Sequence, residues 1–126
     1  MAAPRDFRDH PDGWRTGDYP MDVEGLRARL KPGTDPILAD VAETVPRFVQ
    51  NPRFPVGFAG VDLDLYSSTR DALRLFTLPG RKMLPHTPMY FDDTLTAFNH
   101  QFAGELLAIE EFNNESHESR LTRGTA

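Results

Sequence analysis

The sequence predicts an α/β fold in which parallel strands alternate with helices. Three apolar segments of strand length recur along the 126-residue chain, and each precedes a segment in which apolar residues have helical spacing. The apolar segments do not alternate with polar residues, which is typical of strands buried on both faces of a parallel sheet. Each segment ends in aspartate: Asp40, then Asp62 and Asp64, then Asp92 and Asp93. These observations indicate one parallel sheet covered by helices through right-handed crossovers.

Residues 1–20 are expected to form an irregular N-terminal segment. Prolines, glycines and charged residues surround Trp14 there, and no helical or alternating period is found. A short amphipathic helix should follow, because Asp22 is a suitable N-cap and Pro32 with Gly33 ends the apolar spacing.

The first two strand-helix units follow this helix. Residues 36–40 are expected to form a strand, and Thr44 is expected to cap a helix that carries Pro46 in its first turn, where proline is tolerated. Residues 55–61 are expected to form the second strand, and the Ser-Ser-Thr sequence at 67–69 to cap the second helix.

The third unit begins with a strand at residues 88–91 and continues into a long helix. The acidic residues Glu105, Glu110 and Glu111 are assigned to the solvent-exposed face of that helix. Residues 114–126 are expected to form a frayed polar tail, so the partial α/β domain covers residues 21–113. The predicted buried face of the helix is marked by Leu95, Phe98, Phe102, Leu106 and Ile109.

Composition excludes several classes of function. The net charge of −5 repels phosphate backbones and anionic lipids, so neither nucleic acid nor a membrane is expected as a partner. The chain has no cysteine, which excludes disulfides, thiolate zinc sites and thiol nucleophiles and is typical of a reducing compartment. No signal peptide or membrane-spanning stretch is found, so a cytoplasmic location is expected.

The aspartates at the strand ends are the candidate functional residues. The carboxyl ends of parallel strands share one edge of a sheet, where ligands bind in open α/β folds. Grouped carboxylates suit a hard divalent cation such as Mg²⁺, Mn²⁺ or Ca²⁺. Alternatively, each aspartate caps the turn or helix after its strand, and for Asp62, Asp92 and Asp93 both interpretations stay open. His100 is kept as a candidate acid or base, because it follows the aspartate pair on the predicted helix.

Two motifs carry a family resemblance. Residues 62–69 read DLDLYSST and residues 90–93 read YFDD, each directly after a predicted strand. These resemble the D-x-D-x-Y-x-S-T and D-D motifs of one group of class I S-adenosylmethionine-dependent methyltransferases, the macrocin O-methyltransferase-like branch. The similarity extends over residues 8–113, through GELLAIEEFN at 104–113.

The resemblance implies a Rossmann-like sheet and a divalent metal, such as Mg²⁺, held by Asp62, Asp92 and Asp93. In this family the metal orients an acceptor hydroxyl, which here would belong to a sugar or another small hydroxylated metabolite. The resemblance makes Asp62 the candidate proton acceptor and also one of the residues expected to bind the cofactor. Asp40 and Val41 match the position near the adenine of S-adenosylmethionine.

The chain departs from the family at its beginning. The family starts with a strand, a glycine-rich turn and a second strand with an acidic end, which together bind the methionine part and ribose of the cofactor. No G-x-G sequence between a strand and a helix is found here. We therefore expect the central portion of a methyltransferase fold, a truncated and inactive fragment whose open sheet self-associates or is completed by a partner chain.

Two other functions stay open. The set Asp62, Asp64, Thr69, Lys82 and Asp92 with Asp93 has the residue types of a haloacid-dehalogenase-type phosphatase. That resemblance is weaker, because Tyr66 stands where such phosphatases carry threonine or valine. The third alternative is a non-enzymatic interaction domain.

Overall fold

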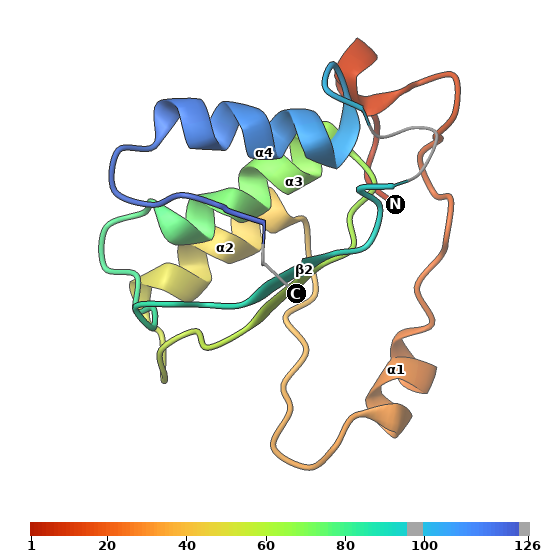
Figure 1. The fold of residues 1–126 in the computed structure, drawn as a ribbon. Helices are drawn as coiled ribbons and strands as arrows, with labels where there is room; N and C mark the ends of the chain where they lie inside the picture. The colour runs from red at the N-terminus through yellow and green to blue at the C-terminus, as the bar shows by residue number, and fades with distance from the viewer. Residues whose placement is uncertain (96–99, 124–126) are drawn as a thin grey trace.

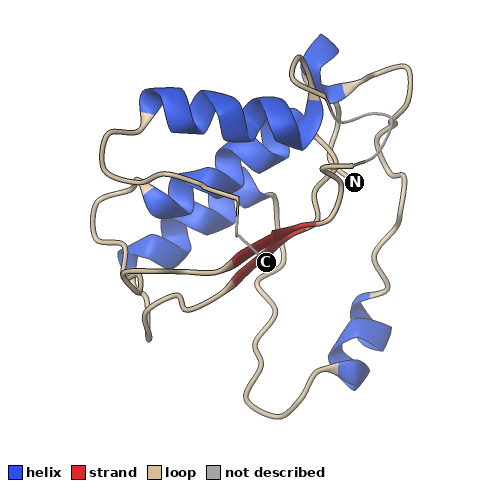
Figure 2. Ribbon diagram, in the orientation of Figure 1, coloured by secondary structure: helices blue, strands red, loops and turns tan. Residues whose placement is uncertain are grey.

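The computed structural model describes residues 1–95 and 100–123, which form a mixed α/β fold. Three helices, α2, α3 and α4, lie on one face of a parallel pair of strands, while α1 stands apart (Figure 1). In Figure 2, the described helices that lie near the strands are all on the same side of them. The elements are η1 (Phe7–Asp9), α1 (Val23–Arg29), α2 (Val41–Gln50), β1 (Ala59–Val61), α3 (Tyr66–Leu73), η2 (Arg74–Phe76), β2 (Met89–Phe91) and α4 (Gly104–Glu115), where η marks a 3-10 helix.

The two strands confirm the prediction of parallel pairing. Gly60 of β1 lies opposite Tyr90 of β2, and the last residues, Val61 and Phe91, also pair. An isolated parallel bridge between Val56 and Met83 continues the alignment toward the amino ends. Both strands are shorter than expected, but their carboxyl ends lie side by side.

The expected strand at residues 36–40 is wrong. These residues have no regular structure, and the side chain of Ile37 is 59% exposed. A short apolar run becomes a strand only where another strand pairs with it, and no described residue pairs with this segment. The helix therefore begins earlier than predicted: the Asp40 carboxylate, and not Thr44, caps α2 by accepting a hydrogen bond from the Ala42 N–H at 2.8 Å.

The cap of α3 comes from a distant part of the chain. Its N-cap residue, Leu65, makes no side-chain cap hydrogen bond, and the Ser-Ser-Thr sequence at 67–69, expected as the cap, lies inside the helix. The buried Asp9 carboxylate instead accepts hydrogen bonds from the backbone N–H groups of Ser67 and Arg5, each at 2.7 Å. This contact ties the irregular N-terminal segment to α3.

The core lies between α3 and α4. Tyr66, Leu73 and Phe76 pack there against Ala108 of α4. The prediction that the last helix begins near residue 95 is wrong, because Leu95 is 97% exposed and α4 begins only at Gly104. Phe98 lies outside the described residues. The inward face of α4 carries Glu105, Ala108 and Phe112, so Phe102, Leu106 and Ile109 do not mark it.

The segment after α4 is not frayed up to Leu121. The Asn113 side chain binds both the N–H and the carbonyl oxygen of Leu121, at 2.7 and 2.9 Å. The Ser119 hydroxyl donates to the Phe76 carbonyl oxygen at 3.1 Å. These hydrogen bonds hold the polar segment against η2 and α4.

Helix α1 confirms the predicted N-cap. The Asp22 carboxylate accepts a hydrogen bond from the Gly25 N–H at 2.9 Å. The helix contributes no buried residue, which agrees with its separate position in Figure 1. None of the described helices has the length and apolar character needed to cross a membrane.

Candidate metal centre

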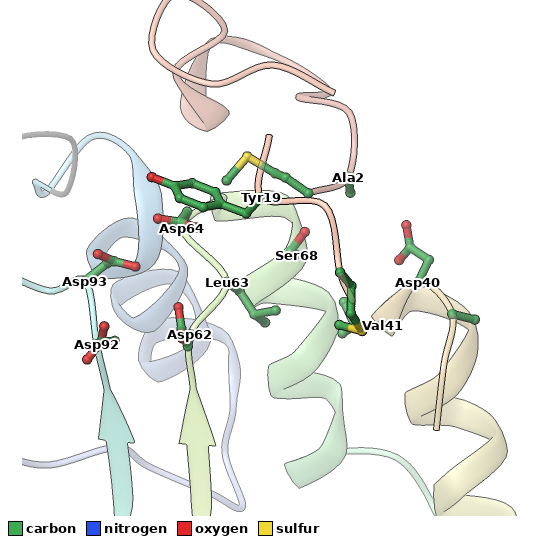
Figure 3. Close-up of a pocket in the computed structure, with 13 residues that line it drawn as sticks. Ala2, Tyr19, Asp40, Val41, Asp62, Leu63, Asp64, Ser68, Asp92 and Asp93 are labelled. Carbon is green, nitrogen blue, oxygen red and sulfur yellow. The ribbon is translucent and has the colours of Figure 1, made fainter. Parts of the chain in front are cut away.

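Three carboxylates converge at the carboxyl ends of β1 and β2. Asp62 directly follows β1, Asp64 lies two residues later, and Asp93 follows β2 (Figure 3). One carboxylate oxygen of each residue lies within 4.8 Å of the others. The convergence follows from the parallel register, because Val61 and Phe91 pair and their successors leave the sheet at the same edge. We call these three residues the aspartate cluster.

Asp64 has the most perturbed environment of the aspartate cluster. Its φ angle of 55° lies in the left-handed region, which aspartate tolerates better than most residues, and the chain turns there from β1 toward α3. Burial raises the pKa of Asp64 to about 6, and the negative charges of Asp93, Asp62 and Asp92 act in the same direction. A cation at this position would remove that repulsion.

Asp92 borders the cluster without belonging to it. Its backbone N–H donates to the Val61 carbonyl oxygen at 3.0 Å and so extends the pairing of the strands. Its carboxylate accepts a hydrogen bond from the Tyr90 hydroxyl at 2.5 Å. Asp92 is exposed and lines the same pocket, but its carboxylate is not part of the group formed by Asp62, Asp64 and Asp93.

A pocket of about 830 Å³ contains all the residues that the sequence analysis assigned to metal and cofactor. The aspartate cluster and Asp92 form one wall, and Asp40 with Val41 forms part of the opposite wall (Figure 3). The N-terminal segment contributes the remaining wall. The lining residues are Met1, Ala2, Tyr19, Met21, Ala39, Asp40, Val41, Asp62, Leu63, Asp64, Ser68, Asp92 and Asp93.

Asp40 combines its place in the pocket with a structural role. It caps α2, and one of its carboxylate oxygens lies 3.8 Å from the Arg5 guanidinium. The capping alternative of the sequence analysis therefore holds for this aspartate. Val41, the first residue of α2, is half-buried beside it.

Glu105 neither lines the pocket nor belongs to the aspartate cluster, but the charges of Asp93 and Asp64 act on it. It is not solvent-exposed as expected, because its side chain is 0% exposed in the first turn of α4. Burial raises the pKa of Glu105 to about 7, the charges of Asp93 and Asp64 act in the same direction, and backbone hydrogen bonding from Leu63 and Asp93 opposes the rise. A signal existed in the sequence, since Glu105 precedes Ala108 and Phe112 by three and seven residues, the spacing of one helix face.

The other candidate residues do not line the pocket. The His100 Nδ1 atom accepts a hydrogen bond from the Phe102 N–H at 3.2 Å, and the His100 ring packs against that of His10. The Lys82 ammonium lies 3.5 Å from the Pro52 carbonyl oxygen, and the Lys82 backbone pairs with Val56 before β1 begins. Lys82 is thus at the amino ends of the strands, away from the aspartate cluster.

The aspartate cluster suits a hard divalent cation. Mg²⁺ and Ca²⁺ bind oxygen at about 2.1 and 2.4 Å, so ligand atoms on opposite sides of one ion lie roughly 4 to 5 Å apart. The oxygens of the cluster, within 4.8 Å of one another, meet this condition. For S-adenosylmethionine the fit is partial, because the chain has the wall formed by Asp40 and Val41 but no glycine-rich turn.

Comparison of the chain with models of protein families, with curated proteins and with solved structures finds no match. The functional assignment therefore depends on the pocket, the aspartate cluster and the two sequence motifs.

Proposed function

We propose that the chain is the metal-binding and acceptor-binding part of an S-adenosylmethionine-dependent, divalent-metal-assisted O-methyltransferase with a Rossmann-like sheet. The convergence of Asp62, Asp64 and Asp93 at the carboxyl ends of two parallel strands carries this proposal. Ligands bind at this edge in open α/β sheets. The D-x-D and D-D motifs that supply the three carboxylates are also the motifs of the family resemblance.

In this proposal the aspartate cluster holds the cation, and each residue has a distinct position. A bound divalent cation supplies a lowered pKa and a fixed orientation to an acceptor hydroxyl. Asp62 is the exposed member of the cluster, whereas Asp64 and Asp93 are half-buried. Asp62 is therefore best placed to accept the proton of a hydroxyl that enters from the pocket. Asp92, which accepts a hydrogen bond from Tyr90, borders the same space.

The cofactor side of the pocket is incomplete in this chain. Asp40 and Val41, which the resemblance assigns to the adenine, line the wall opposite the aspartate cluster. The contacts that the family makes to the methionine part and ribose come from a glycine-rich turn and an acid that this sequence does not contain. We therefore propose no methyl transfer by these residues alone, and we expect weak binding of S-adenosylmethionine.

Lys82 argues against the phosphatase alternative. A haloacid-dehalogenase-type site needs a lysine beside the nucleophilic aspartate, but the Lys82 ammonium contacts the Pro52 carbonyl oxygen at the amino ends of the strands. Thr69, the other residue that this alternative requires, is buried inside α3.

Thermal unfolding tests the metal proposal. Millimolar Mg²⁺ or Mn²⁺ should raise the melting temperature, because a ligand that binds only the folded state stabilises it. Asp93→Asn should abolish most of this rise, whereas Asp92→Asn should reduce it less, since Asp92 lies outside the cluster. Asp12→Asn, at an exposed acid of the N-terminal segment, is the matched control. A melting temperature that metal leaves unchanged in the unmutated protein would refute the site.

A further inference from the structure

The pocket beside the aspartate cluster has an unbalanced charge. Five of its lining residues are aspartates, and none of the described lining residues is a lysine, an arginine or a histidine. The Arg5 guanidinium, outside the lining, lies 3.8 Å from Asp40 but makes its closer contact, 2.6 Å, with Asp71. A divalent cation carries only two positive charges. The pocket therefore stays negatively charged when the metal centre is occupied.

Asp92 is the aspartate best placed to act on a ligand instead of on the metal. It is exposed and lines the pocket, but its carboxylate does not belong to the aspartate cluster. Its backbone is fixed by the hydrogen bond from its N–H to the Val61 carbonyl oxygen at 3.0 Å. The Tyr90 hydroxyl donates to its carboxylate at 2.5 Å, and a carboxylate has about four acceptor positions, so capacity for a further donor remains.

Tyr19 brings an aromatic ring to the same pocket. It is 71% exposed, and in Figure 3 its side chain points from the N-terminal segment toward the wall that carries Asp64 and Asp93. Its φ angle of 54° lies in the left-handed region, which a bulky side chain rarely adopts, and Pro20 restricts it further. Such backbone conformations cluster at active sites and ligand clamps. An aromatic face also attracts organic cations, because the face of the ring is negative.

We propose that the acceptor of this site carries a positively charged amine besides its hydroxyl, and that Asp92 and Tyr19 bind the amine. This inference rests on the proposed function, in which the aspartate cluster holds the cation that orients the hydroxyl. The exposed side chain of Met21, beside Tyr19 in the pocket lining, offers an apolar surface to the body of the acceptor. An anionic acceptor would be repelled by Asp92.

Three phenols of similar shape and different charge test the proposal. Tyramine carries an ammonium group, 4-ethylphenol is neutral and 4-hydroxyphenylacetate carries a carboxylate. Each is titrated into the full chain at saturating Mg²⁺, and the shifts of the amide NMR signals of pocket residues give the dissociation constant. Tyramine should bind about 10-fold more tightly than 4-ethylphenol, the combined effect of an ion pair and a cation–π contact at an exposed site. The carboxylate should bind most weakly.

Two variants assign the preference to the proposed residues. Asp92→Asn removes the charge, and Tyr19→Leu removes the ring but keeps an apolar side chain. Each should reduce the ratio of tyramine to 4-ethylphenol affinity by about 3-fold. The matched controls are Asp12→Asn and Phe54→Leu, an exposed acid and an exposed aromatic residue outside the pocket lining, which should retain the ratio.

The outcomes separate this inference from the function on which it rests. Equal affinities for the three phenols, no binding of any of them, or a preference that both variants retain would overturn the amine proposal. If one variant fails to fold, as judged by circular dichroism, the other decides the question. Removal of Mg²⁺ by a chelator should increase the preference for tyramine, because it uncovers the charges of the aspartate cluster. A preference that Mg²⁺ leaves unchanged, in a chain that binds no Mg²⁺, would refute the metal site and not the amine site.

Discussion

Glu105 makes the stability of the metal-free protein depend on pH. In the unfolded chain its pKa is that of an ordinary glutamate, 4.5, whereas burial raises it to about 7 in the folded protein. Between these two values the folded state binds a proton that the unfolded state has lost. The free energy of unfolding must then fall as pH rises through this range.

The size of the effect follows from the difference between the two pKa values. A difference of one pKa unit is equivalent to about 1.4 kcal/mol, so the rise at Glu105 corresponds to roughly 3 kcal/mol in the limit. Between pH 5 and pH 8, where most of this range is crossed, we expect a loss of about 2 to 3 kcal/mol. Asp64, whose pKa is also raised, to about 6, changes the stability in the same direction.

Urea unfolding at pH 5, 6, 7 and 8, in the presence of a chelator, measures this dependence. Glu105→Gln removes the titrating group, so its free energy of unfolding should fall much less over the same range. Glu110→Gln keeps Glu105 and should follow the unmutated protein. The reasoning is refuted if the unmutated protein is equally stable at pH 5 and pH 8, or if Glu105→Gln retains the full slope.

Three further predictions concern the cap, the cofactor and the sheet. Asp9→Ala should lower the free energy of unfolding by about 2 kcal/mol, because it removes the buried acceptor of two backbone N–H groups. Chemical unfolding measures this loss, and a loss no larger than that of the exposed control Asp12→Ala would contradict the capping role. Calorimetry should detect weak or no binding of S-adenosylmethionine, and micromolar affinity would contradict the partial pocket. Light scattering over a hundredfold dilution should detect self-association through the strand pair, where Phe58, directly before β1, and Tyr90 of β2 are exposed. A monodisperse monomer would refute this.

The local patterns that the sequence predicted correctly are those with a cause inside a few residues. Asp22 caps α1 as expected, and the apolar segments around Val61 and Phe91 form strands. Their parallel pairing is not local, but the alternation of strands and helices predicts it, and the convergence of Asp62 and Asp93 follows because parallel strands end at one edge.

The features that the sequence did not predict depend on distant parts of the chain. Residues 36–40 form no strand because no described segment pairs with them, a condition that their own composition does not reveal. The cap of α3 is the Asp9 carboxylate, which accepts a hydrogen bond from the backbone N–H of Ser67, 58 residues later in the chain. The apolar spacing from Leu95 to Ile109 predicts a buried face that leaves Glu105 in solvent, but α4 begins at Gly104 and turns Glu105, Ala108 and Phe112 inward.

The aspartate cluster as a cation site is the central claim, and Mn²⁺ titration followed by NMR tests it most directly. Paramagnetic Mn²⁺ broadens the signals of nuclei near its binding site. At substoichiometric Mn²⁺ the amide signals of Asp62, Asp64 and Asp93 should broaden first, while those of Val56 and Lys82, at the amino ends of the strands about 20 Å away, should stay sharp. Broadening that begins elsewhere, or is equal at all exposed acidic residues, would contradict the account.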